Sequence, residues 1–259
     1  MRLLKRLLLG LLALILIALL GLYVAQPTLT TRLVGLMFGM QGPQQSIAGG
    51  VVPALVVAAD SERTIPADAL ARIVGIAIDQ GLIGSVDDTV ATYVREWAVD
   101  ERRRITIREM LQQASGIDFP GFTGLLEMTL GDDVEPYTLN RGVAEPAGEH
   151  FEYNNINPEV LGILLQRISG KHYSQYLERH IWQYVSKDNG KIRIDSAQHG
   201  IPIPFCCLDA PARSWLRFGL LHLDGGRVGE RRVVPAQWMR DIVTPSPASA
   251  CTSCHPGTS

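Results

Sequence analysis

The most hydrophobic part of the chain lies close to its start. Residues 7–25 form an uncharged, apolar run that follows three cations within the first six positions. Nineteen residues at about 1.5 Å per residue nearly match the roughly 30 Å hydrocarbon layer of a bilayer. Residues 1–26 are therefore predicted to be a single-pass anchor in the inner membrane, with lipid as its partner and the rest of the chain on the periplasmic or extracellular side. A cleaved signal segment is the alternative, and it exports the same domain.

The hydrophobic pattern divides the remaining chain into three parts. Residues 27–60 are rich in glycine and proline and are predicted to be a linker, whose only strand-like segment is residues 51–59. Residues 61–248 are predicted to form the folded domain. Residues 249–259 are predicted to be a tail that is unrelated to this domain. The length of 259 residues and the apolar content of 46% suffice for one core.

A polar turn followed by an apolar helix organises the domain. Residues 145–170 contain a Tyr-Asn-Asn sequence and then apolar positions at helical spacing from Val160 onward, with Gly170 suited to the helix end. The asparagines can cap the first backbone N–H groups of this amphipathic helix. Tyr153 and Asn155 are therefore predicted to lie on a rigid shoulder at the entrance of a helix.

The other predicted elements are mostly helical. Residues 119–137 are predicted to be a loop-rich lid, and residues 187–203 to be irregular. The helical spacing of apolar positions indicates further helices at residues 68–97 (interrupted by a turn), 107–114, 173–185, 213–223 and 235–243.

Tyr153 and Asn155 are the candidate site residues. A phenol can relay a proton, and an amide can orient a substrate carbonyl. The simpler interpretation of the same residues is a capping turn with a half-buried tyrosine. The residues alone leave both interpretations open.

Other chemically suggestive residues have structural explanations. Asp87 and Asp88 are adjacent on a turn and point apart, which favours a Ser-x-Asp turn over paired carboxylates. Ser115 lacks a Gly-x-Ser-x-Gly setting and is predicted to be a turn residue. The run of arginines at residues 102–104 is predicted to be solvated. No metal ligand set is predicted, because the histidines lack metal-ligand spacing; they are His150, His172, His180, His199 and His222.

Charge excludes one class of partner. The net charge is −2, and no basic stripe or aromatic platform follows the first six residues. Nucleic-acid binding is therefore not expected.

The four cysteines fall into two pairs. Cys206 and Cys207 are adjacent, which is a poor geometry for a mutual disulfide. Cys251 and Cys254, followed by His255, have the spacing for covalent attachment of a c-type haem. The alternative for this motif is a tail without a cofactor, because little sequence follows it to enclose a porphyrin. No cofactor is therefore predicted.

Four stretches together resemble the β-lactamase-related, or penicillin-recognising, serine hydrolases. The sequence VGIAIDQGLI at residues 74–83 is followed by SVDD, and TIREMLQQASG occupies residues 106–116. The Tyr153 region and FCCLDAPARSWLRFG at residues 205–219 are similar to the branch of 6-aminohexanoate-dimer hydrolase and class C β-lactamases. The resemblance covers roughly residues 70–247 in order.

The resemblance implies an α+β, β-lactamase/transpeptidase-like fold. The helical half is expected to be retained and the antiparallel sheet to be depleted, after the N-terminal transmembrane helix. The implied chemistry is acyl transfer from an amide or ester through an acyl-enzyme, with Tyr153 assisting proton transfer and Asn155 holding the substrate.

The nucleophile of that chemistry is missing from the sequence. The family carries Ser-x-x-Lys at the start of its first core helix, and these positions fall on Thr64 and Ala67. The family's third motif is not found either. We therefore expect a pseudoenzyme with little or no hydrolysis. The alternatives are a non-catalytic module of the cell envelope that binds an amide, ester or peptidoglycan-like ligand, and a haem protein through Cys251, Cys254 and His255.

Overall fold

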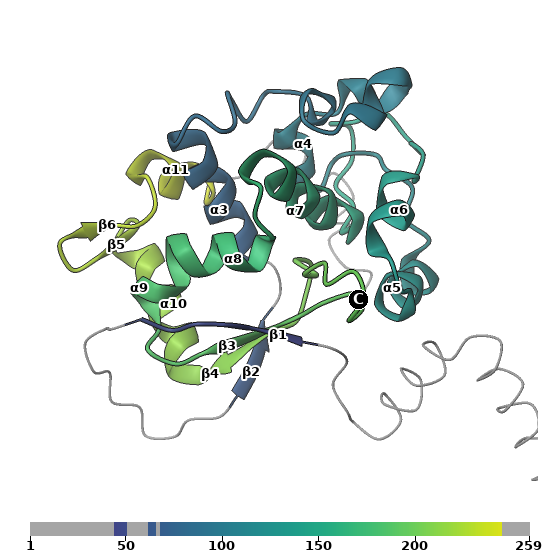
Figure 1. Ribbon diagram of the computed structural model, residues 1–259. Helices are drawn as coiled ribbons and strands as arrows, with labels where there is room; N and C mark the ends of the chain where they lie inside the picture. Colours follow the sequence, from purple (N-terminus) through teal and green to yellow (C-terminus); the bar gives the residue numbers. More distant parts are fainter. Residues whose placement is uncertain (1–43, 51–61, 66–67, 245–259) are drawn as a thin grey trace, which may run out of the picture.

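The computed structural model describes residues 44–50, 62–65 and 68–244 (Figure 1). The predicted anchor at residues 7–25, the strand-like segment at 51–59 and the Cys251–Cys254–His255 motif lie outside these residues. Within the described ranges, none of the helices is both long and apolar enough to cross a bilayer.

A four-stranded antiparallel sheet of order β1-β3-β4-β2 lies at one side of the helices (Figure 1). Its strands are β1 (Gln44–Ile47), β2 (Glu62–Ile65), β3 (Gly190–Arg193) and β4 (Leu208–Pro211). Two predictions are corrected here. β1 forms within the predicted linker, and β3 forms within the segment predicted to be irregular. Each strand has four residues and is partnered by distant sequence, so neither leaves a strong local pattern.

The helical part follows β2 along the chain. Its larger helices are α3 (Asp68–Asp79), α5 (Gly121–Leu130), α7 (Ile156–Ser169) and α10 (Ala212–Leu223). Shorter α-helices are α4 (Ile107–Leu111), α6 (Val134–Leu139), α8 (Tyr173–Leu177), α9 (Gln183–Val185) and α11 (Ala236–Asp241). Single turns of 3₁₀ helix occupy Val90–Thr92, Arg95–Val99 and Glu101–Arg104, a π-helical turn covers Glu178–Trp182, and a hairpin joins β5 (Arg227–Val228) to β6 (Arg231–Arg232).

Helix α7 is the centre of the molecule. Its first ten residues are all buried, because α3, α4, α6 and α8 pack around it (Figure 1). It is therefore a core helix, buried on more sides than the amphipathic pattern predicted. Gly170 ends it in a left-handed conformation, φ 65°, as predicted.

The predicted lid is instead helical. Residues 119–137 contain α5 and the start of α6, and Met128 and Val134 are buried in the core. Asp133 caps α6 by accepting a hydrogen bond from the Glu135 amide, at 3.3 Å. Pro120 and Gly131 lie at the two ends of α5, whereas Gly124 lies within it.

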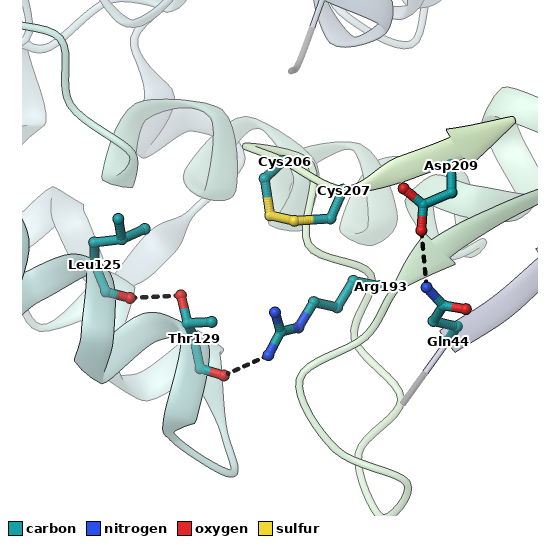
Figure 2. The surroundings of a disulfide bond; sticks show 7 residues. All are labelled: Gln44, Leu125, Thr129, Arg193, Cys206, Cys207 and Asp209. Atoms are coloured by element: carbon teal, nitrogen blue, oxygen red, sulfur yellow. Dashed lines mark hydrogen bonds between the residues drawn. A yellow bond between two sulfur atoms is a disulfide. The ribbon is translucent and has the colours of Figure 1, made fainter. Parts of the chain in front are cut away.

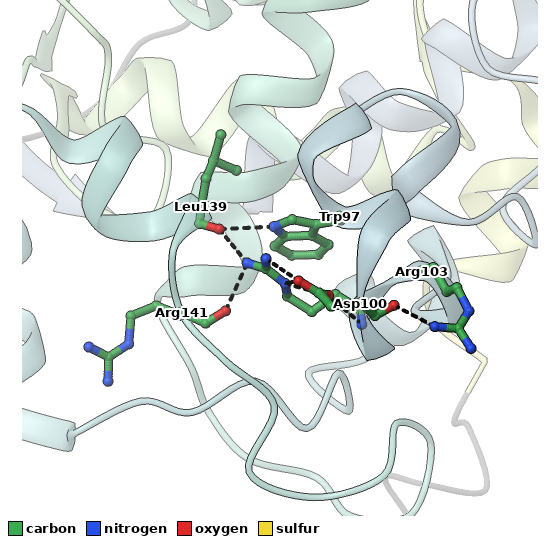
Figure 3. Close-up of polar contacts among 6 residues, drawn as sticks. Trp97, Asp100, Arg103, Leu139 and Arg141 are labelled. Carbon is green, nitrogen blue, oxygen red and sulfur yellow. Dashed lines mark hydrogen bonds and ion pairs between the residues drawn. The ribbon is translucent and has the colours of Figure 1, made fainter.

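Arg102 is held within a network and is not simply solvated. Its side chain is only 13% exposed, and its guanidinium donates two hydrogen bonds from Nε to Asp100, at 2.9 and 3.1 Å. It also donates to the carbonyl oxygens of Leu139 and Arg141 and lies 5.3 Å from the ring centre of Trp97 (Figure 3). Its sequence neighbours 103 and 104 are exposed, so the prediction fails at one position of the three.

Cys206 and Cys207 form a disulfide, contrary to the prediction (Figure 2). Cys207 adopts φ 70°, and its carbonyl oxygen accepts a hydrogen bond from the Arg193 amide at 3.1 Å. This left-handed backbone conformation is uncommon outside glycine, and the amino-acid sequence gives no sign of it.

Candidate functional site

The N-terminus of α7 presents the two residues that the sequence singled out. Tyr153 is 60% exposed, whereas Asn155 is 8% exposed. Neither side chain makes a hydrogen bond to the described part of the protein. Asn155 is the N-cap residue of α7 but makes no capping bond with its side chain. The side chain of Asn154 does so instead, because its Oδ1 accepts a hydrogen bond from the Ile156 amide at 2.9 Å. The phenol of Tyr153 is thus exposed to solvent, whereas the side chain of Asn155 is nearly buried.

The loop after α4 supports this shoulder from behind. The Oε1 atom of Gln113 accepts hydrogen bonds from the Asn154 amide, at 3.0 Å, and from Nδ2 of Asn157, at 2.8 Å. The Gln113 carbonyl oxygen accepts another from the Glu152 amide at 2.8 Å. Asn154 Nδ2 donates to the Ile117 carbonyl oxygen at 2.7 Å. These bonds fix the backbone on both sides of Tyr153.

Helix α4 owes its start to a capping box. The Thr106 hydroxyl accepts from the Glu109 amide, and the Glu109 carboxylate accepts from the Thr106 amide at 2.7 Å. The stretch at residues 106–116 that resembles the family thus acts as a structural support for the Tyr153 shoulder.

Ser115 is part of this support and has no base beside it. It is 2% exposed, donates to Oδ1 of Asn157 at 2.5 Å and accepts from the Ile117 amide at 3.3 Å. An amide oxygen does not take up a proton near neutral pH. Ser115 thus lies in the loop just after the turn at residues 112–113.

The turn at residues 85–88 is also structural. Asp88 Oδ2 accepts hydrogen bonds from the Ser85 amide and from the Tyr93 hydroxyl, at 3.1 and 2.5 Å. Asp87 forms an ion pair with Arg108 at 2.6 Å, and the arginine lowers the pKa of the Asp87 carboxyl. The two carboxylates have separate partners, as the turn interpretation predicted.

Thr64, at the position where the family has its serine, lies in strand β2 and not at a helix start. Its Cα is paired with that of Asp209 in β4, and helix α3 begins only at Asp68. The Asp209 carboxylate accepts a hydrogen bond from Gln44 at 3.0 Å (Figure 2). A Ser-x-x-Lys pair works because positions three apart share one face of a helix, and residue 64 lies outside such a helix.

A second polar group gathers near the other end of α7. A cavity of about 570 Å³ is bordered by Gln166 and Arg167 of α7 and by Asp133, Glu135 and His199. One ligand atom each of Asp133, Asp195 and His199 lie within 4.8 Å of one another. The prediction of dispersed histidines missed this group, although Asp195 and His199 are only four residues apart in the sequence.

Comparisons with known proteins agree with this arrangement. Residues 71–186 match the Beta-lactamase family. The 6-aminohexanoate-dimer hydrolase of Paenarthrobacter ureafaciens is 24% identical over 196 residues, which cover 70% of this chain. Over these residues the chain resembles the β-lactamase-related serine hydrolases, as the sequence predicted. The match spans only about half of that relative's length, 49%, and 20% of protein flp from Staphylococcus aureus strain MW2, which is 28% identical over 102 residues.

Solved structures of β-lactamase-related proteins share the fold. A Bacillus anthracis protein assigned as a 6-aminohexanoate-dimer hydrolase superposes with a TM-score of 0.62 at 20% identity, covering 70% of this chain and 52% of that protein. A D-stereospecific amidohydrolase from a Streptomyces species gives a TM-score of 0.56 at 17% identity, covering 74% and 67% respectively. The predicted β-lactamase/transpeptidase-like, helix-rich α+β fold is thereby confirmed.

Proposed function

We propose that this chain binds an amide or ester ligand at the Tyr153 shoulder of a serine-hydrolase-like domain, and that it cleaves the ligand slowly or not at all. Resemblance to this family supports the ligand class, because one relative is named a 6-aminohexanoate-dimer hydrolase and one structural neighbour a D-stereospecific amidohydrolase. The exposed phenol of Tyr153 and the unbonded amide of Asn155 support binding. Both groups can donate hydrogen bonds to a carbonyl oxygen.

The observation that carries the proposal is the position of the hydroxyl groups. Thr64 lies on strand β2, and Ser115 is buried against an amide. A hydroxyl attacks a carbonyl only when a neighbouring base takes its proton. Neither residue has the helical Ser-x-x-Lys arrangement, so acylation is not expected.

Labelling with a fluorescent penicillin and with a fluorophosphonate ester tests the catalytic half of this proposal. We expect no covalent adduct on the full chain. The Thr64→Ser/Ala67→Lys double variant is expected to remain unlabelled as well, since residue 64 lies outside α3. An adduct that is lost in Thr64→Ala or in Ser115→Ala would overturn the inactive assignment.

Ligand-dependent thermal stabilisation tests the binding half. Benzylpenicillin and the linear dimer of 6-aminohexanoate are suitable probes, because a ligand that binds only the folded state raises Tm. Tyr153→Phe and Asn155→Ala should each reduce the shift, while Tyr184→Phe, a distant and partly buried tyrosine, should keep it. A shift that survives both shoulder variants, or no shift with either probe, would contradict binding at this position.

The proposed setting is the outer face of the inner membrane, with residues 1–26 as the anchor. The apolar run at residues 7–25 and the cations before it support this topology. A fusion of alkaline phosphatase to residue 244 should be active in cells, because that enzyme needs an oxidising compartment. An inactive fusion of full length would contradict export.

A further inference from the structure

The carboxylate of Asp195 is fixed in an interior position behind the cavity near the end of α7. It is fully buried and accepts hydrogen bonds from the amides of Ser196, at 2.6 Å, Ile201, at 2.8 Å, and Val134, at 3.4 Å. The first two bonds go to Oδ1, and only the longest goes to Oδ2. Oδ2 therefore keeps acceptor capacity in a direction set by the backbone.

His199, from the same segment after β3, and Asp133, from the segment before α6, approach the same point. Oδ1 of Asp133 caps helix α6, while Oδ2 lies 3.9 Å from Nδ1 of His199. His199 Nδ1 lies 3.0 Å from the Asp132 carbonyl oxygen, which can only accept, so Nδ1 carries the proton in this bond and a metal bound at Nδ1 would replace it. The His199 amide donates to the Ser196 hydroxyl at 3.1 Å. Two segments of the fold, one before α6 and one after β3, thus bring one imidazole and two carboxylates together, with one ligand atom of each within 4.8 Å of the others.

The surroundings carry more negative charge than their cations offset. Arg167 is bound to Glu96 and Glu135, at 2.7 and 2.6 Å, so its charge is already shared between two carboxylates. Glu159 is completely buried, and neither of its oxygens has a hydrogen-bond partner. Burial, followed by the charges of Asp195 and Glu135, raises the pKa of Glu159 well above its usual value. The unpartnered Glu159 carboxyl therefore lies within electrostatic reach of Asp195 and Glu135.

We propose that Asp133, Asp195 and His199 bind a divalent transition-metal ion, with Zn²⁺ as the best fit. One imidazole nitrogen and two carboxylate oxygens form a three-ligand set of the kind that leaves a fourth position open. Zinc binds such ligands at about 2.0–2.2 Å, which places tetrahedral ligand atoms about 3.4 Å apart, so a pair of ligand atoms 4.8 Å apart would have to close by roughly 1.4 Å. Mg²⁺ and Ca²⁺ fit this site less well, because they prefer oxygen ligands and one of the three ligands here is an imidazole nitrogen.

The open position faces the cavity. Asp133 and His199 line its wall, and the volume of about 570 Å³ admits a small molecule beside the ion. The site is separate from the Tyr153 shoulder, because Tyr153 precedes α7 whereas Gln166 and Arg167, near its last turn, border the cavity. Zinc binding here does not depend on the proposed ligand binding at Tyr153.

Metal titration of the full chain tests the proposal. The sample for this titration should have no metal-binding affinity tag. It should also contain the substitutions Cys251→Ala and Cys254→Ala, because these cysteines, together with His255, are alternative zinc ligands. Calorimetry should show one Zn²⁺ per chain, and Mg²⁺ should bind far more weakly. The Co²⁺ form should show visible bands of nitrogen and oxygen coordination without sulfur charge transfer.

Two ligand variants and one matched variant decide the location. His199→Ala removes an exposed ligand, and Asp133→Asn removes a charge while keeping an N-cap residue. Each should weaken Zn²⁺ at least about tenfold, the scale of a disturbed metal shell. His172→Ala changes another histidine of the same cavity and should bind like the parent. No Zn²⁺ on the parent, equal affinity in all variants, or equal loss in His172→Ala would overturn the proposal.

Discussion

The hydroxyl of Ser115 lies 2.5 Å from Oδ1 of Asn157 and donates a hydrogen bond to it, across 42 residues of sequence. This bond joins the loop after α4 to the first turn of α7. Gln113 adds a second connection between the same segments. The two stretches that most resemble the family are therefore one structural unit, with Tyr153 on its surface.

Loss of this hydroxyl should affect stability and not labelling. Ser115→Ala leaves the buried Oδ1 of Asn157 without its donor, which should lower the free energy of unfolding by about 1–3 kcal/mol. Urea denaturation measures the change. Thr92→Ala removes an exposed hydroxyl and should cost less than about 0.5 kcal/mol. Equal, small effects in both variants would show that the bond contributes little.

Gly116, the next residue, has a backbone reason to be glycine. Its φ is 68°, and a Cβ there would lie 2.0 Å from the Glu145 carbonyl oxygen. Gly116→Ala should therefore destabilise the fold by at least about 2 kcal/mol. Gly219 is exposed in helix α10 with no atom near its Cβ position, so Gly219→Ala should stabilise by about 0.5–1 kcal/mol. Thermal unfolding of both variants checks the opposite signs.

Two arginines of one run should differ strongly. Arg102→Ala removes the partner of Asp100 and the donor to the Leu139 and Arg141 carbonyl oxygens, and should cost roughly 2–4 kcal/mol. Arg104 is exposed, and Arg104→Ala should change stability by less than about 0.5 kcal/mol. Denaturant midpoints report both values. Similar midpoints for the two variants would mean that the network in Figure 3 is weak.

The disulfide of adjacent cysteines can be located chemically. Peptide mapping after alkylation without reductant should give a peptide with Cys206 and Cys207 unalkylated and lighter by two hydrogens than its reduced form. Cys251 and Cys254 should not be cross-linked to it. A peptide that joins either tail cysteine to Cys206 or Cys207 would contradict the pairing in Figure 2.

Sequence reasoning succeeded where the signal was local. The spacing of apolar residues predicted helices α7 and α10, and Gly170 marked the end of α7. Strand β1 was missed because its sequence is short and polar, and its partner β3 lies about 145 residues away. No local pattern records such a pairing.

The candidate site was predictable to the same extent. Tyr153 and Asn155 are neighbours in sequence, so their shared shoulder followed from the turn before α7. The convergence of Asp133 with Asp195 and His199 depends on the packing of α6 against the segment after β3. The burial of Glu159 likewise depends on the helices packed around α7, and apolar spacing alone predicted only an amphipathic helix there.

Glu159 should make stability depend on pH in a specific direction. Burial raises the pKa of its carboxyl above the unfolded value, so at intermediate pH the folded state binds a proton that the unfolded state has released. Below the pKa of Glu159 in the unfolded chain, near 4.5, this carboxyl is neutral in both states and does not lower the free energy of unfolding. As pH rises from there toward the pKa in the folded protein, the free energy of unfolding falls. The free energy of unfolding should decrease from pH 5 toward pH 8.

Glu159→Gln removes this titration while keeping the shape of the side chain. The variant should lose less stability between pH 5 and pH 8 than the parent, and it should be the more stable of the two at pH 8. Asp195 and His199 also have raised pKa values and contribute slopes of the same sign, so the comparison rests on the difference between variant and parent. The control for lost negative charge is Glu135→Gln. Glu135 is partly exposed, and this variant also removes its ion pair with Arg167. Identical pH profiles for Glu159→Gln and the parent would show that Glu159 is not buried as a neutral acid.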